Sequence, residues 1–179
     1  MNDATPAVSD GTEATVRDAA EKLDSKLTNQ VSFVDNNGNQ VLDMQGRPMQ
    51  RPEGMPPAFF VAKARELVAH AREMPENAIS LLTADLTNFR QGGAWDAQRM
   101  NGEPHGEYLD YSTVAIGIYA QSAGIEFNQI MTLQDTYAWI FSKFGPKTVF
   151  DETYRHLPLT NVWNTRLGYR LAQDGLVGS

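Results

Sequence analysis

The sequence contains no cysteine, which removes several classes of chemistry at once. Without a thiol there is no disulfide, no cysteine nucleophile and no zinc site built on cysteine ligands. Long apolar runs are missing as well, since no stretch approaches the roughly 18 to 20 residues that a membrane-spanning helix needs. The first residues are acidic and polar, unlike a secretory signal peptide, and such a start is also typical of a domain cut from a longer protein.

A basic cluster is also missing. The 15 lysines and arginines are scattered and are outnumbered by 22 acidic residues, which gives a formal net charge of −7. Nucleic-acid-binding proteins usually carry a basic face, because neutralisation of phosphates supplies most of their affinity. The charge therefore disfavours nucleic acid as a partner, whereas it suits a basic protein partner.

What remains is the composition of an ordinary globular domain. The chain has 179 residues, of which 41% are hydrophobic and 21% charged, and this is enough for one domain with its own core. Residues 1–14 are rich in small and polar residues and predict a flexible tail or linker. Residues 15–179 predict a single domain without internal repeats. Apolar residues at helical spacing predict helices at 14–27, 57–74, 75–89, 108–124, 126–145 and 162–176.

Particular residues refine these helices. In 75–89 the spacing predicts that Ile79 faces inward, and Gly92-Gly93 is expected to end this helix. Small residues around Gly117 allow a second helix to approach closely, which predicts that 108–124 is the central helix. We expect Thr160 or Asn161 to cap the last helix.

Residues 31–49 change to the alternating pattern of strands. Val31 and Phe33 alternate with polar residues, and the turn signals Asn37-Gly38 and Gly46–Pro48 follow. These features predict a small two-stranded ribbon with room for a third short strand. The expected fold class is therefore mainly α: a single helical domain with a small N-terminal β-hairpin.

The loop from Gly92 to Tyr111 is the candidate site. Beside the bulky Trp95, the carboxyl group of Asp96 is a candidate general acid, since apolar neighbours disfavour the charged form. Glu107 and Asp110 would share the first turn of the next helix, where its N-terminus favours ionised carboxylates. An acid that faces an ionised carboxylate is the arrangement that glycoside hydrolysis requires. His105 is a candidate general base oriented by one of these carboxylates.

Each of these residues also has a structural interpretation. Glu107 and Asp110 can simply stabilise a helix start, and Asp96 can close an Asx-turn with Trp95 as a core anchor. His105, between a proline and a glycine, is typical of an exposed histidine. The other histidines, His70 and His156, are too far apart in sequence for a recognisable metal motif, so we expect neither a metal site nor a cofactor.

A family resemblance rests on the same segment. Gly92-Gly93, Trp95-Asp96, Asp110-Tyr111 and Gly117, within residues 89–124, resemble the bacterial polymorphic toxin type 44 domain. The resemblance implies a toxin domain at the end of a secreted antibacterial effector. It also implies delivery by a bacterial secretion system into a target cell, with the periplasm as one compartment of action, and neutralisation by a cognate immunity protein.

Three functional hypotheses follow. The first is a hydrolase of a bacterial polymer such as peptidoglycan, with Asp96 or Glu107 as the acid and Asp110 as its partner. Trp95, Tyr108 and Tyr111 would then form its substrate-binding surface. The second is a nuclease toxin that uses His105 and Glu107, and the third is a non-enzymatic structural or adaptor protein.

Overall fold

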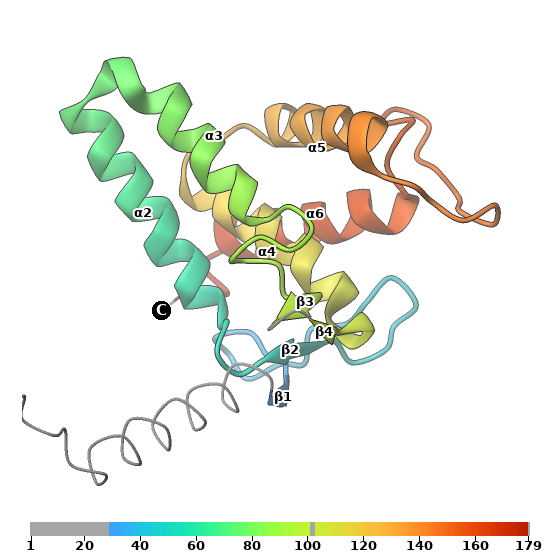
Figure 1. The fold of residues 1–179 in the computed structure, drawn as a ribbon. Coiled ribbons are helices and arrows are strands. Elements are labelled where there is room, and N and C mark those ends of the chain that lie inside the picture. Colours follow the sequence, from blue (N-terminus) through green and yellow to red (C-terminus); the bar gives the residue numbers. More distant parts are fainter. Residues whose placement is uncertain (1–28, 101–102, 179) are drawn as a thin grey trace, which may run out of the picture.

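The computed structural model describes residues 29–100 and 103–178 of the chain. These residues form a mainly α domain with a small N-terminal ribbon, as the sequence predicted (Figure 1). Its helices are α2 (Pro57–Glu73), α3 (Ala78–Asn88), α4 (Leu109–Ser122), α5 (Phe127–Phe141) and α6 (Leu159–Gln173), with short 3₁₀ turns at η1 (Pro75–Asn77) and η2 (Gly106–Tyr108). Its strands are β1 (Gln30–Ser32), β2 (Gln50–Pro52), β3 (Arg99–Met100) and β4 (Glu103–Pro104). The tail predicted at 1–14 and the helix predicted at 14–27 lie outside the described residues.

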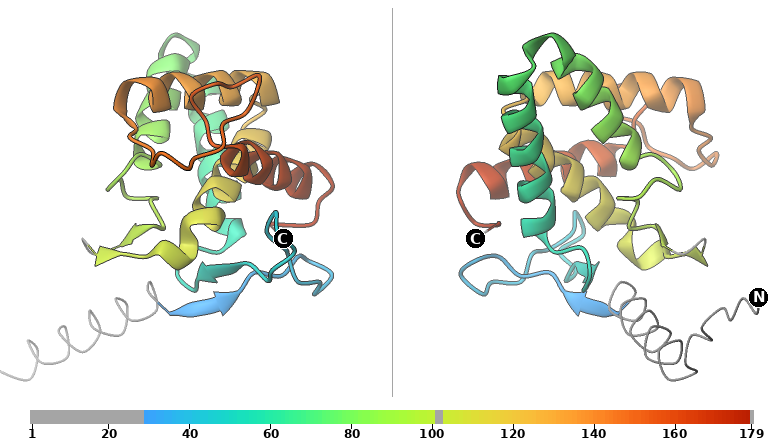
Figure 2. Two further views of the ribbon diagram at one scale, coloured as in Figure 1. Left: turned by 90° about the vertical axis from the view of Figure 1, so that its right-hand side faces the viewer. Right: turned by 60° about the vertical axis from the view of Figure 1, so that its left-hand side comes forward.

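Helix α4 is the centre of the fold, as its small residues predicted. It packs against α6 on one side and against α2 on another, while α3 packs on α2 (Figures 1 and 2). Apart from the exposed Leu109 at its start and the half-buried Ile116, its tyrosine and aliphatic side chains are buried, which is the pattern of a helix inside a core rather than on a surface. The larger hydrophobic cluster surrounds α4, and a smaller one joins α5 to α6 through Met131, Ala138, Leu157 and Val162.

The N-terminal ribbon makes the same turn twice. β1 pairs antiparallel with β2, and between them Asp35 and Asp43, eight residues apart in the sequence, each accept hydrogen bonds from backbone amides of the turn that follows. Gly38 and Gly46 supply the positive φ that both turns need. This is a short internal repeat, so the prediction that residues 15–179 contain none is wrong.

Three buried residues of the ribbon are linked in a ring. The amide of Phe33 donates to the Met49 carbonyl at 3.0 Å, that of Met49 to the Val41 carbonyl at 2.9 Å, and that of Val41 to the Phe33 carbonyl at 2.9 Å. Their side chains enter the larger core cluster. The ribbon thus gains the helical support that a two-stranded sheet needs in water.

Several predicted details of the helices are wrong. Ile79 was expected to face inward, but it is 82% exposed. Helix α3 ends at Asn88, before Gly92-Gly93, although Gly93 does pack closely against the carbonyl oxygen of Asn88. Helix α6 begins at Leu159 directly after Pro158, so its start depends on proline geometry and not on a cap by Thr160 or Asn161.

None of the helices built from the described residues combines the length and the hydropathy required to cross a bilayer.

Candidate functional site

The predicted catalytic loop is held in place by Asp96. The amide of Gly92 donates to Asp96 Oδ2 at 2.8 Å and that of Gln98 to Asp96 Oδ1 at 3.0 Å, while Arg99 Nη1 lies 3.5 Å from Oδ2. Asp96 is only 4% exposed. Both carboxylate oxygens are therefore used to organise the loop, which is the Asx-turn interpretation of this residue.

The aromatic residues next to it belong to the core. Trp95 makes edge contacts with Phe59 at 6.0 Å and Phe89 at 5.1 Å between ring centroids. Tyr111 is fully buried, and its hydroxyl donates to the Met55 carbonyl at 2.5 Å. These rings anchor the loop and the start of α4 to the core, and neither leaves a face on which a substrate can stack. Tyr108 is fully buried as well, so the substrate-binding surface expected from Trp95, Tyr108 and Tyr111 is corrected to a set of core residues.

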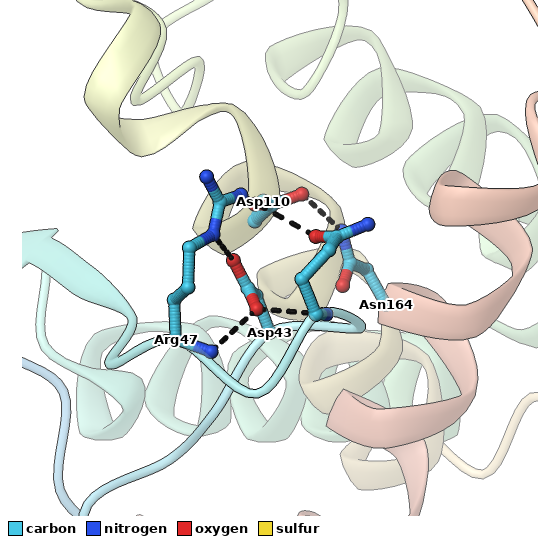
Figure 3. Close-up of polar contacts among 5 residues, drawn as sticks. Asp43, Arg47, Asp110 and Asn164 are labelled. Carbon is cyan, nitrogen blue, oxygen red and sulfur yellow. Dashed lines mark hydrogen bonds and ion pairs between the residues drawn. The ribbon is translucent and has the colours of Figure 1, made fainter.

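Asp110 is bound to a distant helix. Asn164 Nδ2 of α6 donates to Asp110 Oδ1 at 2.7 Å, and Figure 3 shows the two side chains pointing toward one another. Asn164 is 1% exposed, and its Oδ1 has no hydrogen-bond partner among the described residues. The contact fixes the first turn of α4 against α6, so Asp110 has a clear structural role.

The same view contains the second ribbon turn (Figure 3). Arg47 Nε donates to Asp43 Oδ2 at 2.7 Å, and the backbone amides of Gln45 and Arg47 donate to Oδ1. Burial opposes ionisation of Asp43, but these hydrogen bonds outweigh it and lower its pKa. Asp43, Arg47 and Asn164 were not identified from the sequence. The repeated Asp–x–x–Gly turn was a usable signal for Asp43, whereas nothing local marks Asn164.

His105 and Glu107 do contact each other. His105 Nδ1 lies 3.1 Å from Glu107 Oε1. Because an ionised carboxylate only accepts hydrogen bonds, Nδ1 carries the proton in this contact. The other ring nitrogen, Nε2, is buried without a hydrogen-bond partner among the described residues. The imidazole also stacks on the buried ring of Tyr108, with centroids 5.8 Å apart and an angle of 30° between the ring planes.

The local electrostatics keep Glu107 ionised. The backbone amide of Glu107 donates to its own carboxylate and lowers its pKa, partial burial opposes this, and the hydrogen bond from His105 lowers the pKa further. Burial raises the pKa of the Tyr108 hydroxyl, and the nearby charge of Glu107 raises it further. A carboxylate that accepts a hydrogen bond from one imidazole nitrogen fixes the tautomer and orientation of the ring, which is the usual arrangement of a histidine acid/base group.

The structure thus gives the predicted catalytic residues different partners. The carboxylates of Asp96 and Asp110 are each hydrogen-bonded to other groups, the first within its own loop and the second to α6. Only His105 and Glu107 share a direct contact, with the buried Tyr108 beside them. His156 instead contacts Asp135 Oδ2 at 3.1 Å. Within residues 29–100 and 103–178 no group of three His, Cys, Asp or Glu side chains could hold a metal ion.

Comparison of the chain with protein-family models, with curated proteins and with solved structures finds no match.

Proposed function

We propose that this chain is the toxin domain of a secreted antibacterial effector that hydrolyses a bacterial polymer, with His105 as its acid/base group and Glu107 as the carboxylate that orients it. The observation that supports the proposal is the 3.1 Å contact between His105 Nδ1 and Glu107 Oε1, together with an Nε2 that has no partner among the described residues. Histidine is the side chain whose charge ordinarily changes between pH 5 and 8, so it suits proton transfer in both directions.

The chemistry follows from the two ring nitrogens. With its proton held on Nδ1 by Glu107, the neutral imidazole presents the lone pair of Nε2 as a base. Nε2 is buried in this structure, so substrate binding has to expose it. It then removes a proton from the hydroxyl or water that attacks the polymer, and the same proton passes to the leaving group when the bond breaks. Glu107 stabilises the imidazolium formed between these two steps, and its lowered pKa ensures that it is ionised at neutral pH.

Peptidoglycan is the polymer that we favour. The net charge of −7 opposes binding to a polyanion such as RNA or DNA, whereas a wall polymer requires no basic face. The resemblance to polymorphic toxin domains supports delivery into the periplasm of a target cell and neutralisation by an immunity protein. In this account Asp96 and Asp110 position the loop and the helix start, in place of the direct roles that the sequence suggested.

A nuclease is the second candidate, and one observation favours it. The pair that is in contact, His105 and Glu107, is the pair that the nuclease hypothesis named, whereas Asp96 is occupied by the backbone of its own loop. Cleavage of RNA needs a base that activates a hydroxyl of the substrate itself, which a histidine held by a carboxylate can supply.

Expression in two compartments of a bacterium tests these candidates. The full chain is directed to the cytoplasm or to the periplasm, alongside His105→Ala and the matched control His70→Ala, which changes an exposed histidine on α2. Growth arrest confined to the periplasm, lost only in His105→Ala, supports the wall hydrolase. Arrest in the cytoplasm with the same dependence on His105 supports the nuclease. Full toxicity of a folded His105→Ala protein contradicts both, and absence of toxicity in either compartment favours the structural or adaptor protein.

A further inference from the structure

A second histidine–carboxylate pair joins α5 to the loop between α5 and α6. The backbone amide of His156, in this loop, donates to Asp135 Oδ1 of α5 at 2.8 Å, and His156 Nδ1 lies 3.1 Å from Asp135 Oδ2. Because a carboxylate only accepts hydrogen bonds, Nδ1 carries the proton in this contact. The two bonds fix both the backbone and the ring of His156, so the imidazole is oriented before any ligand binds.

The second nitrogen of this ring is open to solvent, unlike that of His105. The side chain of His156 is 46% exposed, and no described residue forms a hydrogen bond with its Nε2. Nε2 of His105 is instead buried. With its proton on Nδ1, His156 therefore presents the lone pair of Nε2 to solvent, as a fixed hydrogen-bond acceptor that a ligand hydroxyl can reach.

The indole of Trp139 lies beside this acceptor. Asp135 and Trp139 are four residues apart on α5, so they occupy the same face of the helix. The ring centroids of Trp139 and His156 are 6.0 Å apart and the ring planes are tilted by 40°. Trp139 is 68% exposed, so most of its indole surface stays open next to the imidazole. A single small ring can therefore contact both residues.

The loop that carries His156 is anchored at the outer edge of the molecule (Figures 1 and 2). The amide of Asp151 donates to the Leu157 carbonyl at 3.0 Å, and the amide of Leu159 donates to the Val149 carbonyl at 2.9 Å. The side chain of Leu157 is 3% exposed and belongs to the cluster that joins α5 to α6. Because the neighbours of His156 are held in this way, ligand binding here requires little further ordering of the loop.

The charges around this site balance. Residues 135–156 contain three acidic and three basic residues: Asp135, Asp151, Glu152, Lys143, Lys147 and Arg155. Binding of a nucleic acid or of an anionic bilayer depends on an excess of basic residues, which this segment lacks. A flat apolar ring beside one uncharged acceptor instead matches a sugar, which has an apolar C–H face and hydroxyl groups at its rim. Ligand sites commonly combine apolar surface with a few polar groups that fix the orientation of the ligand.

We propose that Trp139 and His156, with Asp135 behind them, form a sugar-binding subsite for the glycan strand of peptidoglycan. One face of an N-acetylglucosamine ring stacks on the Trp139 indole, and a hydroxyl of that sugar donates to His156 Nε2. Asp135 is a positioning residue, since it holds the proton on Nδ1 and does not touch the sugar. The choice of a wall glycan rests on the proposed function, whereas recognition of an uncharged sugar follows from the residues of the subsite.

Binding measured apart from cleavage tests the proposal. The full chain with His105→Ala, which cannot use the proposed acid/base group, is titrated calorimetrically with the hexamer of N-acetylglucosamine and is sedimented with peptidoglycan sacculi. We expect it to bind both probes. Added to this chain, Trp139→Ala or His156→Ala should weaken binding about tenfold or more. Asp135→Asn should weaken it less, and should have no further effect once His156 is alanine, because Asp135 acts through that ring.

The matched control is Phe141→Ala, which should leave binding unchanged. Phe141 is 64% exposed on the same helix, but two residues after Trp139 it points about 200° away. Circular dichroism and thermal unfolding establish that each variant is folded.

Three results would overturn the proposal. In the first, the chain binds neither the hexamer nor the sacculi. In the second, folded Trp139→Ala binds as well as its parent. In the third, Phe141→Ala weakens binding as much as Trp139→Ala, which would assign the binding to general apolar surface of α5. A chain that binds the hexamer through Trp139 but whose wild type hydrolyses no polymer would keep the subsite and refute only the proposed function.

Discussion

Gly117 of α4 and Gly168 of α6 bring the backbones of the two helices into direct contact. A Cβ atom at Gly117 would lie 2.1 Å from the Thr165 carbonyl oxygen, and one at Gly168 would lie 2.0 Å from the Val114 carbonyl oxygen. Each glycine therefore leaves room for the backbone of the opposite helix. Because the nearest atoms are backbone atoms, a Cβ at either position could not be accommodated by moving a flexible side chain. This reciprocal contact fixes α6 against α4 and so places Asn164 within reach of Asp110.

Substitution of either glycine should destabilise the domain. Gly117→Ala forces the helices apart, and we expect a loss of about 1–3 kcal/mol in the free energy of unfolding, after the helix-forming tendency of alanine offsets part of the strain. Urea denaturation measures this. Gly145→Ala is the matched control, because its new methyl group would enter open space. Equal stability of Gly117→Ala and Gly145→Ala would mean that the helices are not in close contact.

The central position of α4 could be predicted from the sequence for a local reason. Small residues around Gly117 recur at helical spacing, and this pattern is specific to a helix that another helix approaches closely. At α5 the same kind of reasoning was insufficient. Its apolar residues occupy several faces, so periodicity identified the helix but not which side chains, such as Trp139, stay outside.

The candidate site also contains one contact that could be predicted from the sequence and one that could not. His105 and Glu107 are two residues apart, so their contact needs only local structure and could be anticipated from the sequence. Asp110 and Asn164 are separated by 54 residues, and only the packing of α6 on α4 brings them together. For Asp96 the sequence could not distinguish a catalytic role from a structural one. An aspartate in a glycine-rich loop can stabilise a turn as well as take part in a reaction.

Substitution of Asp96 should lower the stability of the domain, and any loss of activity should follow from that loss of stability. In Asp96→Ala the amides of Gly92 and Gln98 lose their acceptor, and we expect the free energy of unfolding to fall by about 1–3 kcal/mol. Glu152→Ala, which removes an exposed carboxylate in the loop after α5, should have almost no effect. A variant at Asp96 that keeps wild-type stability but loses activity would show that this carboxyl takes part in the reaction.

Asp43 should make folding sensitive to acid. Hydrogen bonds from the amides and guanidinium of its turn lower its pKa below the ordinary value of 3.8 despite opposition from burial. A carboxylate with a lowered pKa in the folded state stabilises the fold above its unfolded pKa, and this contribution is lost as pH falls through the lower, folded value. Asp43→Asn should therefore be less stable than wild type at pH 7, and the difference should shrink below about pH 3.8. Urea denaturation across pH measures this, and a difference that stays constant with pH would contradict the pKa shift.

The rate of polymer hydrolysis by the purified full chain and by two site variants tests the central claim most directly. Peptidoglycan sacculi and RNA serve as separate substrates, and released muropeptides or nucleotides are measured at neutral pH, with thermal unfolding as the control for folding. For the polymer that is cleaved, the account predicts that His105→Ala lowers the rate about a hundredfold or more. Glu107→Gln should cause a smaller loss, since it weakens the orientation of His105 but leaves the imidazole in place. A folded His105→Ala protein that hydrolyses either polymer at the wild-type rate would contradict the account.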